Sequence, residues 1–285
     1  MGLPMARNLM DAGYPMLVWN RTPEKSQPLE QAGATVADSP ADLASRGPQV
    51  IFINVTDTPD VEAILFGEQG LASTANPGTI IVDHSTISPD RTREFADRLA
   101  QQGIEFVDAP VSGGDTGAQQ GTLSIMVGGR DEAVAKVMPM LEVVGKNVVH
   151  LGEPGLGQAC KACNQVAGMV TLLGVCEALA LAKQSGLDMD KMIQVVGGGA
   201  AGSWQLTNLG PKIAQGDHEP GFMIDLVIKD LAIVLDTAKR AGLPMQGTSR
   251  VAELFQQVAD QGGGRLGTQA VAKAIEQAGG FKFDD

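Results

Sequence analysis

Aromatic, cysteine and basic residues are scarce in this sequence, and each shortage excludes a class of protein. Aromatic residues make up only 4% of the 285 residues, too few for platforms on which nucleic-acid bases stack. Three cysteines in a chain of this length do not form a disulfide framework, which favours a reducing compartment. Lys and Arg number 21 against 33 Asp and Glu, so the net charge is −12 and neither nucleic acid nor an anionic membrane is an expected partner.

Long hydrophobic runs and targeting signals are also missing. No uninterrupted apolar run reaches about 18 residues, so we expect no transmembrane helix. The N-terminus lacks the pattern of a secretory signal peptide. Hydrophobic residues at 44% and charged residues at 19% exclude a disordered or fibrous chain. We therefore expect a cytoplasmic globular protein of one large or two ordinary domains.

Glycine, in contrast, is abundant, with 36 of the 285 residues. The usual share is about 7%, so this chain has close to twice the normal content. An excess of glycine in a soluble acidic chain indicates many tight backbone turns, which often surround phosphate groups.

Strand and helix patterns alternate in the first half of the chain. Short apolar runs rich in β-branched residues are typical of strands buried on both faces, and proline in the first turn favours the helices between them. This alternation predicts βαβ units and a doubly wound parallel sheet. The expected strands are residues 15–20, 50–54, 79–83, 104–108, 123–127 and 147–150, and the expected helices are residues 4–12, 23–32, 40–45 and 89–102.

The pattern changes after residue 152. Residues 157–185 form one long apolar helical stretch, which we expect to be buried between other elements. Only helical patterns follow, at residues 189–196, 225–241 and 248–261. The sequence thus predicts an α/β domain over residues 1–152 and an all-helical domain over residues 153–285.

Ser112 and the two glycines after it follow the end of an expected strand, within the sequence Asp-Ala-Pro-Val-Ser-Gly-Gly at residues 108–114. A hydroxyl group beside unobstructed backbone N–H groups forms a natural cradle for a carboxylate. The alternative is a glycine turn that only connects two strands.

Lys161, Asn164 and Gln165 are spaced so that they share one face of the long apolar helix. A lysine among apolar residues is costly unless it has a function or a partner. The alternative is a lysine whose chain extends along the helix to solvent. Near the other end of the chain, Lys229 and Asp230 lie on an expected amphipathic helix, where the structural alternative to a role in the site is a surface ion pair of little energetic worth.

Several other residues favour structural roles. Cys160, Cys163 and Cys176 lie on the apolar helix with no histidine nearby in sequence, so we expect core thiols and no metal site. His84 follows the end of an expected strand, where a single histidine is more often structural than functional.

Taken together, these segments resemble the β-hydroxyacid dehydrogenases, the relatives of 3-hydroxyisobutyrate dehydrogenase. Residues 1–9 match that family's opening motif GLGxMGxPMAxNL from Met1 onward, and residues 108–114 match its substrate-binding signature. Residues 155–165 match GxGxxxKxxNQ, residues 197–203 resemble GGxAGS, and residues 228–231 match IKDL. The resemblance covers essentially the whole chain and is strongest to the tartronate semialdehyde and glyoxylate reductase branch. It implies a Rossmann-type first domain.

The resemblance also implies roles for individual residues. Lys161 would be the catalytic acid and base, whose proton the apolar surroundings should make easier to release. Asn164 and Gln165 would hold Lys161 and the substrate hydroxyl by hydrogen bonds. Substrate would contact Ser112, Gly113, Gly114, Asn164, Gln165 and Asp230, and the dinucleotide would contact Gly2, Leu3, Asn20, Arg21, Thr22, Val55, Thr56, Thr86 and Lys229.

The family's first strand and first two glycines have no counterpart in this sequence, where only Gly2 remains of the turn that faces a pyrophosphate. Without that strand, we expect residues 16–19 and 80–82 to present unpaired strand edges. The chain as written should then bind its cofactor poorly or aggregate. A chain longer by roughly ten residues, enough for one strand and its turn, should bind well.

The end of the second strand of a dinucleotide-binding fold distinguishes the two nicotinamide cofactors. An acidic residue there holds the ribose hydroxyl of NAD, whereas this chain has Asn20, Arg21 and Thr22. An arginine can form a bidentate contact with the 2′-phosphate of NADP, so we predict NADP, with NAD as the alternative.

The sequence therefore predicts the reversible, NADPH-dependent reduction of a small oxo acid or semialdehyde to its hydroxy acid. Tartronate semialdehyde, glyoxylate and succinic semialdehyde represent the expected substrate type. One alternative is a 3-hydroxyisobutyrate dehydrogenase that uses NAD, and another is a dinucleotide-binding protein without turnover. Lys161 argues against an imine reductase, and the few basic residues argue against a phosphosugar substrate. The long apolar helix favours a homodimer or homotetramer.

Overall fold

The computed structural model describes residues 1–284 and divides the chain into two compact units. The first unit is Met1–Lys161 and the second begins at Ala162. Helix α8 (Leu156–Gln184) begins in the first unit and continues into the second. The domain boundary at residues 152 and 153 stays a prediction.

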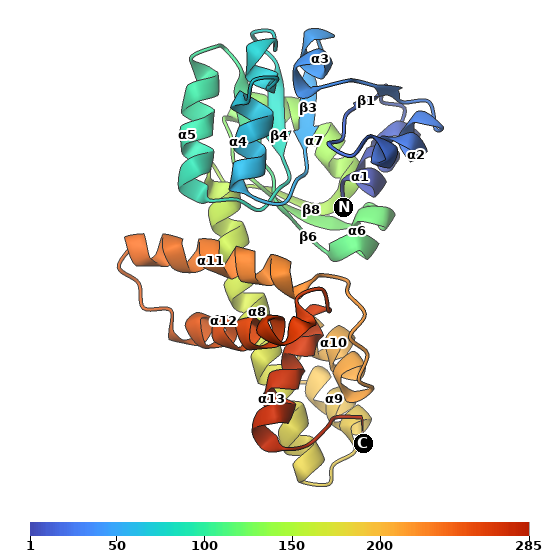
Figure 1. Cartoon of the computed structure of the whole chain (residues 1–285), viewed down its shortest axis with the longest axis vertical. Coiled ribbons are helices and arrows are strands. Elements are labelled where there is room, and N and C mark those ends of the chain that lie inside the picture. Colours follow the sequence, from blue (N-terminus) through green and yellow to red (C-terminus); the bar gives the residue numbers. More distant parts are fainter. Residues whose placement is uncertain (285) are drawn as a thin grey trace. The chain divides into compact units, whose positions relative to one another are not determined.

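Three ladders of strands form the sheet structure of the first unit, drawn in blue to green in Figure 1. The central ladder has the order β3-β4-β5 and is parallel throughout. Strand β7 pairs in parallel with β8 and antiparallel with β6, and an isolated bridge joins Asp108 at the end of β5 to Gly128. The strands are β1 (Leu17–Val18), β2 (Thr35–Val36), β3 (Val50–Ile53), β4 (Ile80–Asp83), β5 (Glu105–Asp108), β6 (Val111–Ser112), β7 (Leu123–Val127) and β8 (Gly145–His150).

Helices cover both faces of the central ladder, because successive strand residues point to opposite sides. Ile80 and Val82 of β4 pack into the core that α1 and α7 complete, whereas Ile81 packs into the core formed with α4 and α5. Figure 1 shows α4 and α5 on one side of β3 and β4 and α1 and α7 on the other. The first-unit helices are α1 (Gly2–Asp11), α2 (Gln27–Glu30), α3 (Pro40–Ser45), α4 (Thr58–Phe66), α5 (Pro89–Ala100), α6 (Gly114–Gln120) and α7 (Asp131–Val144).

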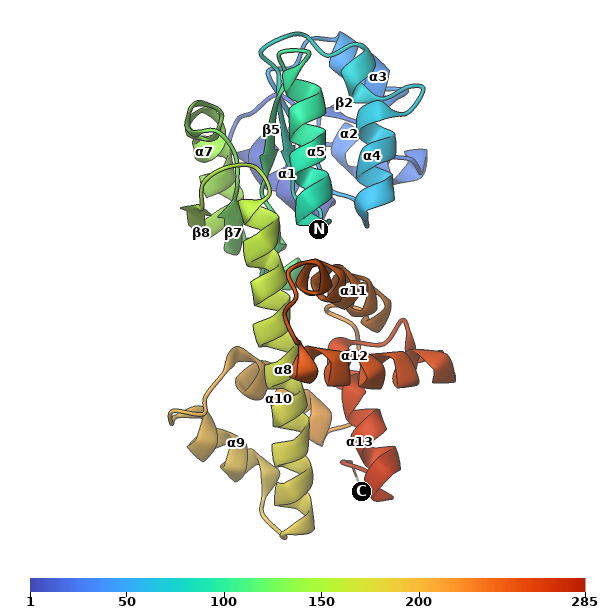
Figure 2. The same cartoon turned by 90° about the vertical axis from the view of Figure 1, so that its left-hand side faces the viewer.

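The second unit is helical and is organised around α8. In Figure 2, α9 lies on one side of α8 and α11, α12 and α13 lie on the other, while α10 crosses behind α8. Leu172 and Cys176 of α8 are fully buried in one core with Leu231 of α11 and Phe255 of α12. The remaining helices are α9 (Met189–Gly197), α10 (Trp204–Ala214), α11 (Ile224–Arg240), α12 (Gln246–Val258) and α13 (Ala272–Gly279).

The α/β fold followed by helices confirms the predicted fold class, with two differences in detail. The first is that β4 lies between β3 and β5, so the prediction of an unpaired edge at residues 80–82 was wrong. The second is that β6 runs antiparallel to β7, which a purely parallel sheet does not include.

Helix α8 is less buried than its composition predicted. Leu181 is 69% exposed and Leu156 is 39% exposed, so this helix is not covered on all sides by the described chain. By length and composition alone, α8 is also apolar enough to cross a membrane, although the core helix of a soluble protein meets the same criteria. The expectation that the chain has no membrane-spanning helix stays a prediction.

Candidate active site

Lys161 is buried near the start of α8, with only 7% of its surface exposed. Its Nζ donates a hydrogen bond of 2.9 Å to the carbonyl oxygen of Val111. Val111 and Ser112 form β6, so the ammonium group is held at the residue directly before the predicted carboxylate cradle. The alternative of a lysine that extends to solvent does not fit this burial.

The two glycines of the cradle have an unusual backbone conformation. Gly113 and Gly114 both have positive φ angles, of 135° and 63°, which L side chains rarely adopt. A Cβ on Gly113 would lie 3.1 Å from Leu123, whereas one on Gly114 would meet no atom within 4 Å, so the backbone faces open space at Gly114. Helix α6 begins at Gly114, where the first backbone N–H groups of a helix have no acceptor within it. A turn of this kind offers donors to a carboxylate.

The start of α8 is fixed by a residue far away in sequence. Asp108, at the end of β5, is fully buried, and its two carboxylate oxygens accept the backbone N–H groups of Gly155 and Gln158, each at 2.7 Å. Burial raises the pKa of Asp108 to about 6, although these hydrogen bonds favour the ionised form. A negative group at a helix N-terminus is also favoured by the helix dipole.

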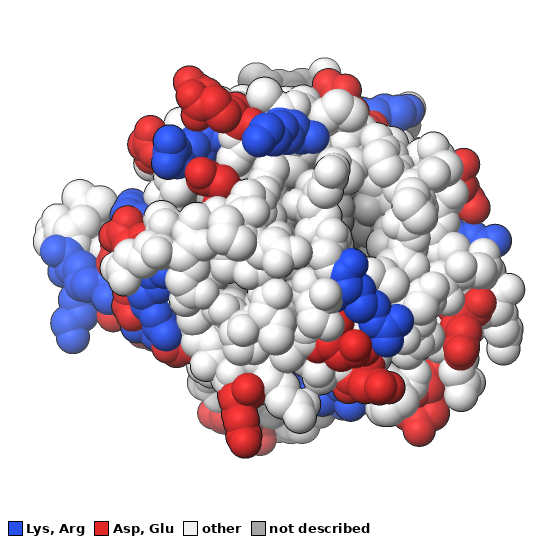
Figure 3. Space-filling model, turned by 90° about the horizontal axis from the view of Figure 1, so that it is seen from above, with Lys and Arg blue, Asp and Glu red and all other residues white. Residues whose placement is uncertain are grey.

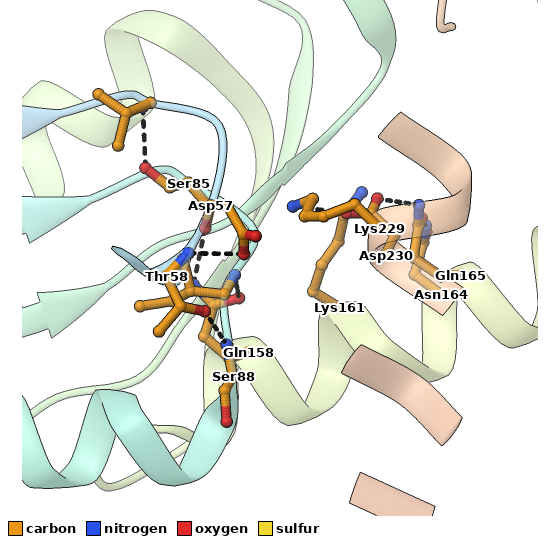
Figure 4. A network of polar contacts seen from close by, with 12 residues as sticks. Asp57, Thr58, Ser85, Ser88, Gln158, Lys161, Asn164, Gln165, Lys229 and Asp230 are labelled. Carbon is orange, nitrogen blue, oxygen red and sulfur yellow. Dashed lines mark hydrogen bonds and ion pairs between the residues drawn. The ribbon is translucent and has the colours of Figure 1, made fainter. Parts of the chain in front are cut away.

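A chain of polar contacts joins four candidate residues in the second unit. Asn164 Nδ2 donates to Gln165 Oε1 at 2.8 Å, and Gln165 Nε2 donates to Asp230 Oδ2 at 2.6 Å. The other oxygen of Asp230 lies 2.7 Å from Lys229 Nζ (Figure 4). Asp230 is 3% exposed and the Lys229 side chain 17%, so the alternative of a surface ion pair does not fit this burial. That Asn164 and Gln165 hold Lys161 stays a prediction.

The turn after β1 carries the residues predicted to select the cofactor. Asn20 Oδ1 accepts the backbone N–H of Thr22 at 2.9 Å, which closes the turn. The side chain of Arg21, between them, is 80% exposed and lies 3.1 Å from Asp60 of α4. An exposed guanidinium on a closed turn fits a phosphate group. Trp19 directly precedes this turn.

The remaining cofactor candidates lie at strand ends or at the start of α1. Gly2 is the first residue of α1, and a Cβ there would lie 3.5 Å from that of Asn54, just after β3. Leu3 follows it, and the free N–H groups of this first turn suit a pyrophosphate. Val55 and Thr56 follow β3, and Thr86 follows β4. Since ligands of doubly wound sheets bind beyond the carboxyl ends of the strands, a dinucleotide fits the residues present.

His84 has the structural role that its position favoured. It is 5% exposed, its ring stacks on Phe52, and its Nδ1 lies 2.6 Å from the carbonyl oxygen of Ala109. Burial lowers its pKa to about 4, so the ring is neutral at pH 7 and Nδ1 must donate to that carbonyl. A neutral ring held in this way does not supply a proton at neutral pH.

The cysteines differ from one another. Cys176 is buried in the core of the second unit, as predicted, and burial raises the pKa of its thiol to about 12. Cys160 is only partly buried and Cys163 is exposed, so the prediction of three core thiols was wrong for Cys163.

Models of known protein families match both parts of the chain. The NAD-binding domain of 6-phosphogluconate dehydrogenase matches residues 1–152, and the NAD-binding domain of NADP-dependent 3-hydroxyisobutyrate dehydrogenase matches residues 155–275. The 2-hydroxy-3-oxopropionate reductase of Escherichia coli is 39% identical over 99% of this chain and 96% of its own length. The chain belongs to the β-hydroxyacid dehydrogenase family. It is therefore an NAD(P)-dependent oxidoreductase.

Other relatives of this β-hydroxyacid dehydrogenase agree with that assignment. An uncharacterised oxidoreductase of Bacillus subtilis is 41% identical over 96% of this chain and 94% of its own. The crystal structure of a 3-hydroxyisobutyrate dehydrogenase from Salmonella typhimurium superimposes with a TM-score of 0.85 at 31% identity, covering 95% of each chain. Imine reductases share the fold at 19–24% identity.

Three residues that contact the predicted site residues or fix the helix that carries Lys161 were not predicted from the sequence. Gln158 and Asp108 fix the start of α8, and Asp60 pairs with Arg21. Asp108 belongs to the motif at residues 108–114, so its place at a strand end was a usable signal. Asp60 contacts a residue 39 positions away in sequence, and Gln158 contacts residues about 70 positions away. No local sequence pattern indicates contacts between residues so far apart.

Proposed function

We propose that this β-hydroxyacid dehydrogenase reduces a small oxo acid or semialdehyde to its hydroxy acid with NADPH, reversibly. The observation that carries the proposal is the position of Lys161, a buried ammonium group bonded to Val111 beside the cradle at Ser112–Gly114. An acid next to a carboxylate cradle suits a substrate whose carbonyl group lies close to its carboxylate.

The chain's residues would divide the work as follows. Ser112, Gly113 and Gly114 bind the substrate carboxylate and so orient the carbonyl group. When bound, the reduced nicotinamide supplies a hydride to the carbonyl carbon. Lys161 donates a proton from Nζ to the carbonyl oxygen as negative charge develops there, and it takes the proton back in the oxidative direction. Asn164, Gln165 and Asp230 would bind substrate, and Lys229 would contact the cofactor.

The cofactor preference rests on the turn after β1. Arg21 supports NADP, and a related structure, Psf3, at 28% identity and a TM-score of 0.86, holds NADP+. Another relative, at 33% identity, is an NAD-dependent L-serine dehydrogenase of Pseudomonas aeruginosa, so the family includes both preferences. The substrate type is supported by the E. coli 2-hydroxy-3-oxopropionate reductase.

We also propose that the protein acts in the cytoplasm, as a homo-oligomer, without a nucleic-acid or membrane partner. In Figure 3, a group of Lys and Arg side chains lies at the left edge with acidic side chains among them, and the other basic side chains on that face are scattered. Arg91, for example, lies 2.7 Å from Glu62. Surfaces of mixed charge do not favour a phosphate backbone.

Replacing Lys161 tests the proposed function. We expect Lys161→Ala to lower kcat by several orders of magnitude, because the variant lacks the amine that donates the proton to the carbonyl oxygen. NADPH should still bind. The measurements are turnover with glyoxylate, tartronate semialdehyde, succinic semialdehyde and 3-hydroxyisobutyrate, and fluorescence titration of NADPH. Full turnover in the variant would exclude Lys161 as the acid. NADPH binding by the wild type without turnover on any of these substrates would favour a non-catalytic protein.

A further inference from the structure

Gln158 fastens the loop that follows β4 to the start of α8. Its Nε2 donates to the carbonyl oxygen of Ser85 at 2.7 Å, and its Oε1 accepts the backbone N–H of Ile87 at 3.1 Å (Figure 4). These two backbone groups belong to the peptide units on either side of Thr86. One side chain therefore holds both neighbours of a predicted cofactor residue.

Gln158 is itself held firmly. It is 1% exposed, and its backbone N–H donates to Asp108 Oδ2 at 2.7 Å. The side-chain amide is satisfied in one orientation only, since the Ser85 carbonyl requires a donor and the Ile87 N–H requires an acceptor. A buried polar network in which every group is paired is rigid, and losing one partner is costly.

Lys161 lies three residues after Gln158 on the same helix, so the two side chains are neighbours along one face. The carbonyl that holds Lys161 belongs to Val111, three residues after Asp108. Asp108 thus fixes the start of α8, Gln158 fixes the Thr86 loop to it, and both contacts lie within the first unit.

We propose that Gln158 is a positioning residue that couples the loop around Thr86 to the helix that carries Lys161. A cofactor contact at Thr86 would order the loop, and the amide of Gln158 would transmit this order to the first turn of α8. Because such coupling is reciprocal, a fixed α8 would also favour cofactor binding. The proposal rests on the proposed function, in which Thr86 contacts the dinucleotide and Lys161 is the acid.

Gln158→Glu tests the coupling, because glutamate has nearly the same shape and lacks the donor for Ser85. Gln158→Asn is the second variant, whose amide is one methylene too short to reach both backbone groups. The matched control is Gln269→Ala in the second unit. Gln269 is also 1% exposed, and its Nε2 donates to the carbonyl oxygens of Asp217 and Glu219, so it too fastens a loop.

The readouts separate coupling from folding. Hydrogen exchange is measured with and without NADPH in peptides that cover residues 85–88 and 155–161, together with NADPH affinity, kcat, KM and melting temperature. In the wild type we expect NADPH to slow exchange in both segments. In Gln158→Glu we expect slowing only in residues 85–88, with kcat lower by about 10- to 100-fold and NADPH affinity lower by about 3- to 10-fold.

The control variant should lose melting temperature without any of these changes. Wild-type kcat and wild-type exchange in Gln158→Glu would overturn the coupling, as would the same kcat loss in Gln269→Ala at an equal melting temperature. If Gln158→Glu does not fold, Gln158→Asn is judged by the same criteria. Binding of NADPH without turnover in the wild type would remove the proposed function, yet the exchange data would still decide the coupling. Absence of any dinucleotide binding would overturn both.

Discussion

Arg21 is the residue to which we assign the choice of cofactor, and in the structure it pairs with Asp60. Its guanidinium lies 3.1 Å from Asp60, which is 30% exposed. An exposed ion pair of this kind contributes little to stability. The pair instead orients the Arg21 side chain and places a competitor beside it. A 2′-phosphate must share the guanidinium with the carboxylate of Asp60 or displace that carboxylate.

Replacing Arg21 and replacing Asp60 should therefore change the preference for NADPH over NADH in opposite directions. We expect Arg21→Ala to reduce kcat/KM for NADPH by about 10- to 100-fold more than for NADH, the range for a lost charge-assisted hydrogen bond. We expect Asp60→Asn to raise the preference for NADPH a few-fold, since the repulsion between carboxylate and phosphate disappears. Steady-state kinetics with both cofactors measure this.

Asp42→Asn is the control for the second variant, because Asp42 pairs with Arg46 at 2.7 Å elsewhere in the first unit. This change should leave the cofactor preference unaltered. A clear NADH preference in the wild type would contradict the role given to Arg21.

Single residues were predictable from the sequence where chemistry and local spacing sufficed. Lys161 stands out among apolar neighbours on a helix, and its burial confirms that signal. Its partner, the carbonyl of Val111, is a backbone atom 50 residues away and has no signature in the sequence. The same holds for Gln158, whose amide partners become evident only in the folded chain.

At the scale of elements, the attachment of α8 to β5 sets where Lys161 lies. Asp108 makes this attachment at a cost, because burial disfavours its ionised form and raises its pKa to about 6. An unfolded aspartate releases its proton near pH 4, so the folded protein keeps that proton to a higher pH.

The contribution of Asp108 to stability decreases as the pH rises. Because the folded pKa of Asp108 is the higher one, its contribution to stability is fully present below about pH 4 and is lost as the pH rises through about 6. Asp108→Asn removes this titration. We therefore expect the free energy of unfolding of the wild type, minus that of the variant, to fall by up to about 3 kcal/mol between pH 4 and 7. Urea unfolding across this range measures it, and a difference that is constant with pH would contradict the assigned shift.

Elements with strong periodicity were predictable, and elements rich in glycine were not. The strands β3, β4 and β5 coincide with the predicted apolar runs, because burial on both faces leaves a continuous signal. Helix α6 begins at the second glycine of the predicted cradle, where the sequence predicted no helix. Its helical state depends on packing against β7, where a Cβ on Gly117 would lie 3.1 Å from Leu123.

At the scale of the whole molecule, the second unit leaves large apolar side chains uncovered. Leu181, Leu187, Val195 and Trp204 are between 58% and 74% exposed. They lie on α8, α9 and α10 or between α8 and α9, and removing apolar surface from water favours association. Their exposure is the observation that supports the proposed homo-oligomer.

Light scattering at micromolar concentration should therefore give the mass of a dimer or tetramer. The double variant Leu181→Glu and Val195→Glu should lower that mass, because a buried unpaired carboxylate opposes association. Leu243→Glu is the control, since Leu243 is 59% exposed in the segment between α11 and α12. A monomeric wild type would contradict the proposed assembly.

The two tryptophans of the chain give each unit its own fluorophore. Trp19 stands directly before the turn that carries Arg21, whereas Trp204 is the first residue of α10. Reduced nicotinamide absorbs at the wavelengths where indole emits, so a dinucleotide bound at that turn would quench the emission of Trp19 by energy transfer. A chain with Trp19→Phe would report on the second unit alone, and one with Trp204→Phe on the first. The unfolding of each unit, and the arrival of the cofactor, would then be visible as separate optical signals from an otherwise unlabelled protein.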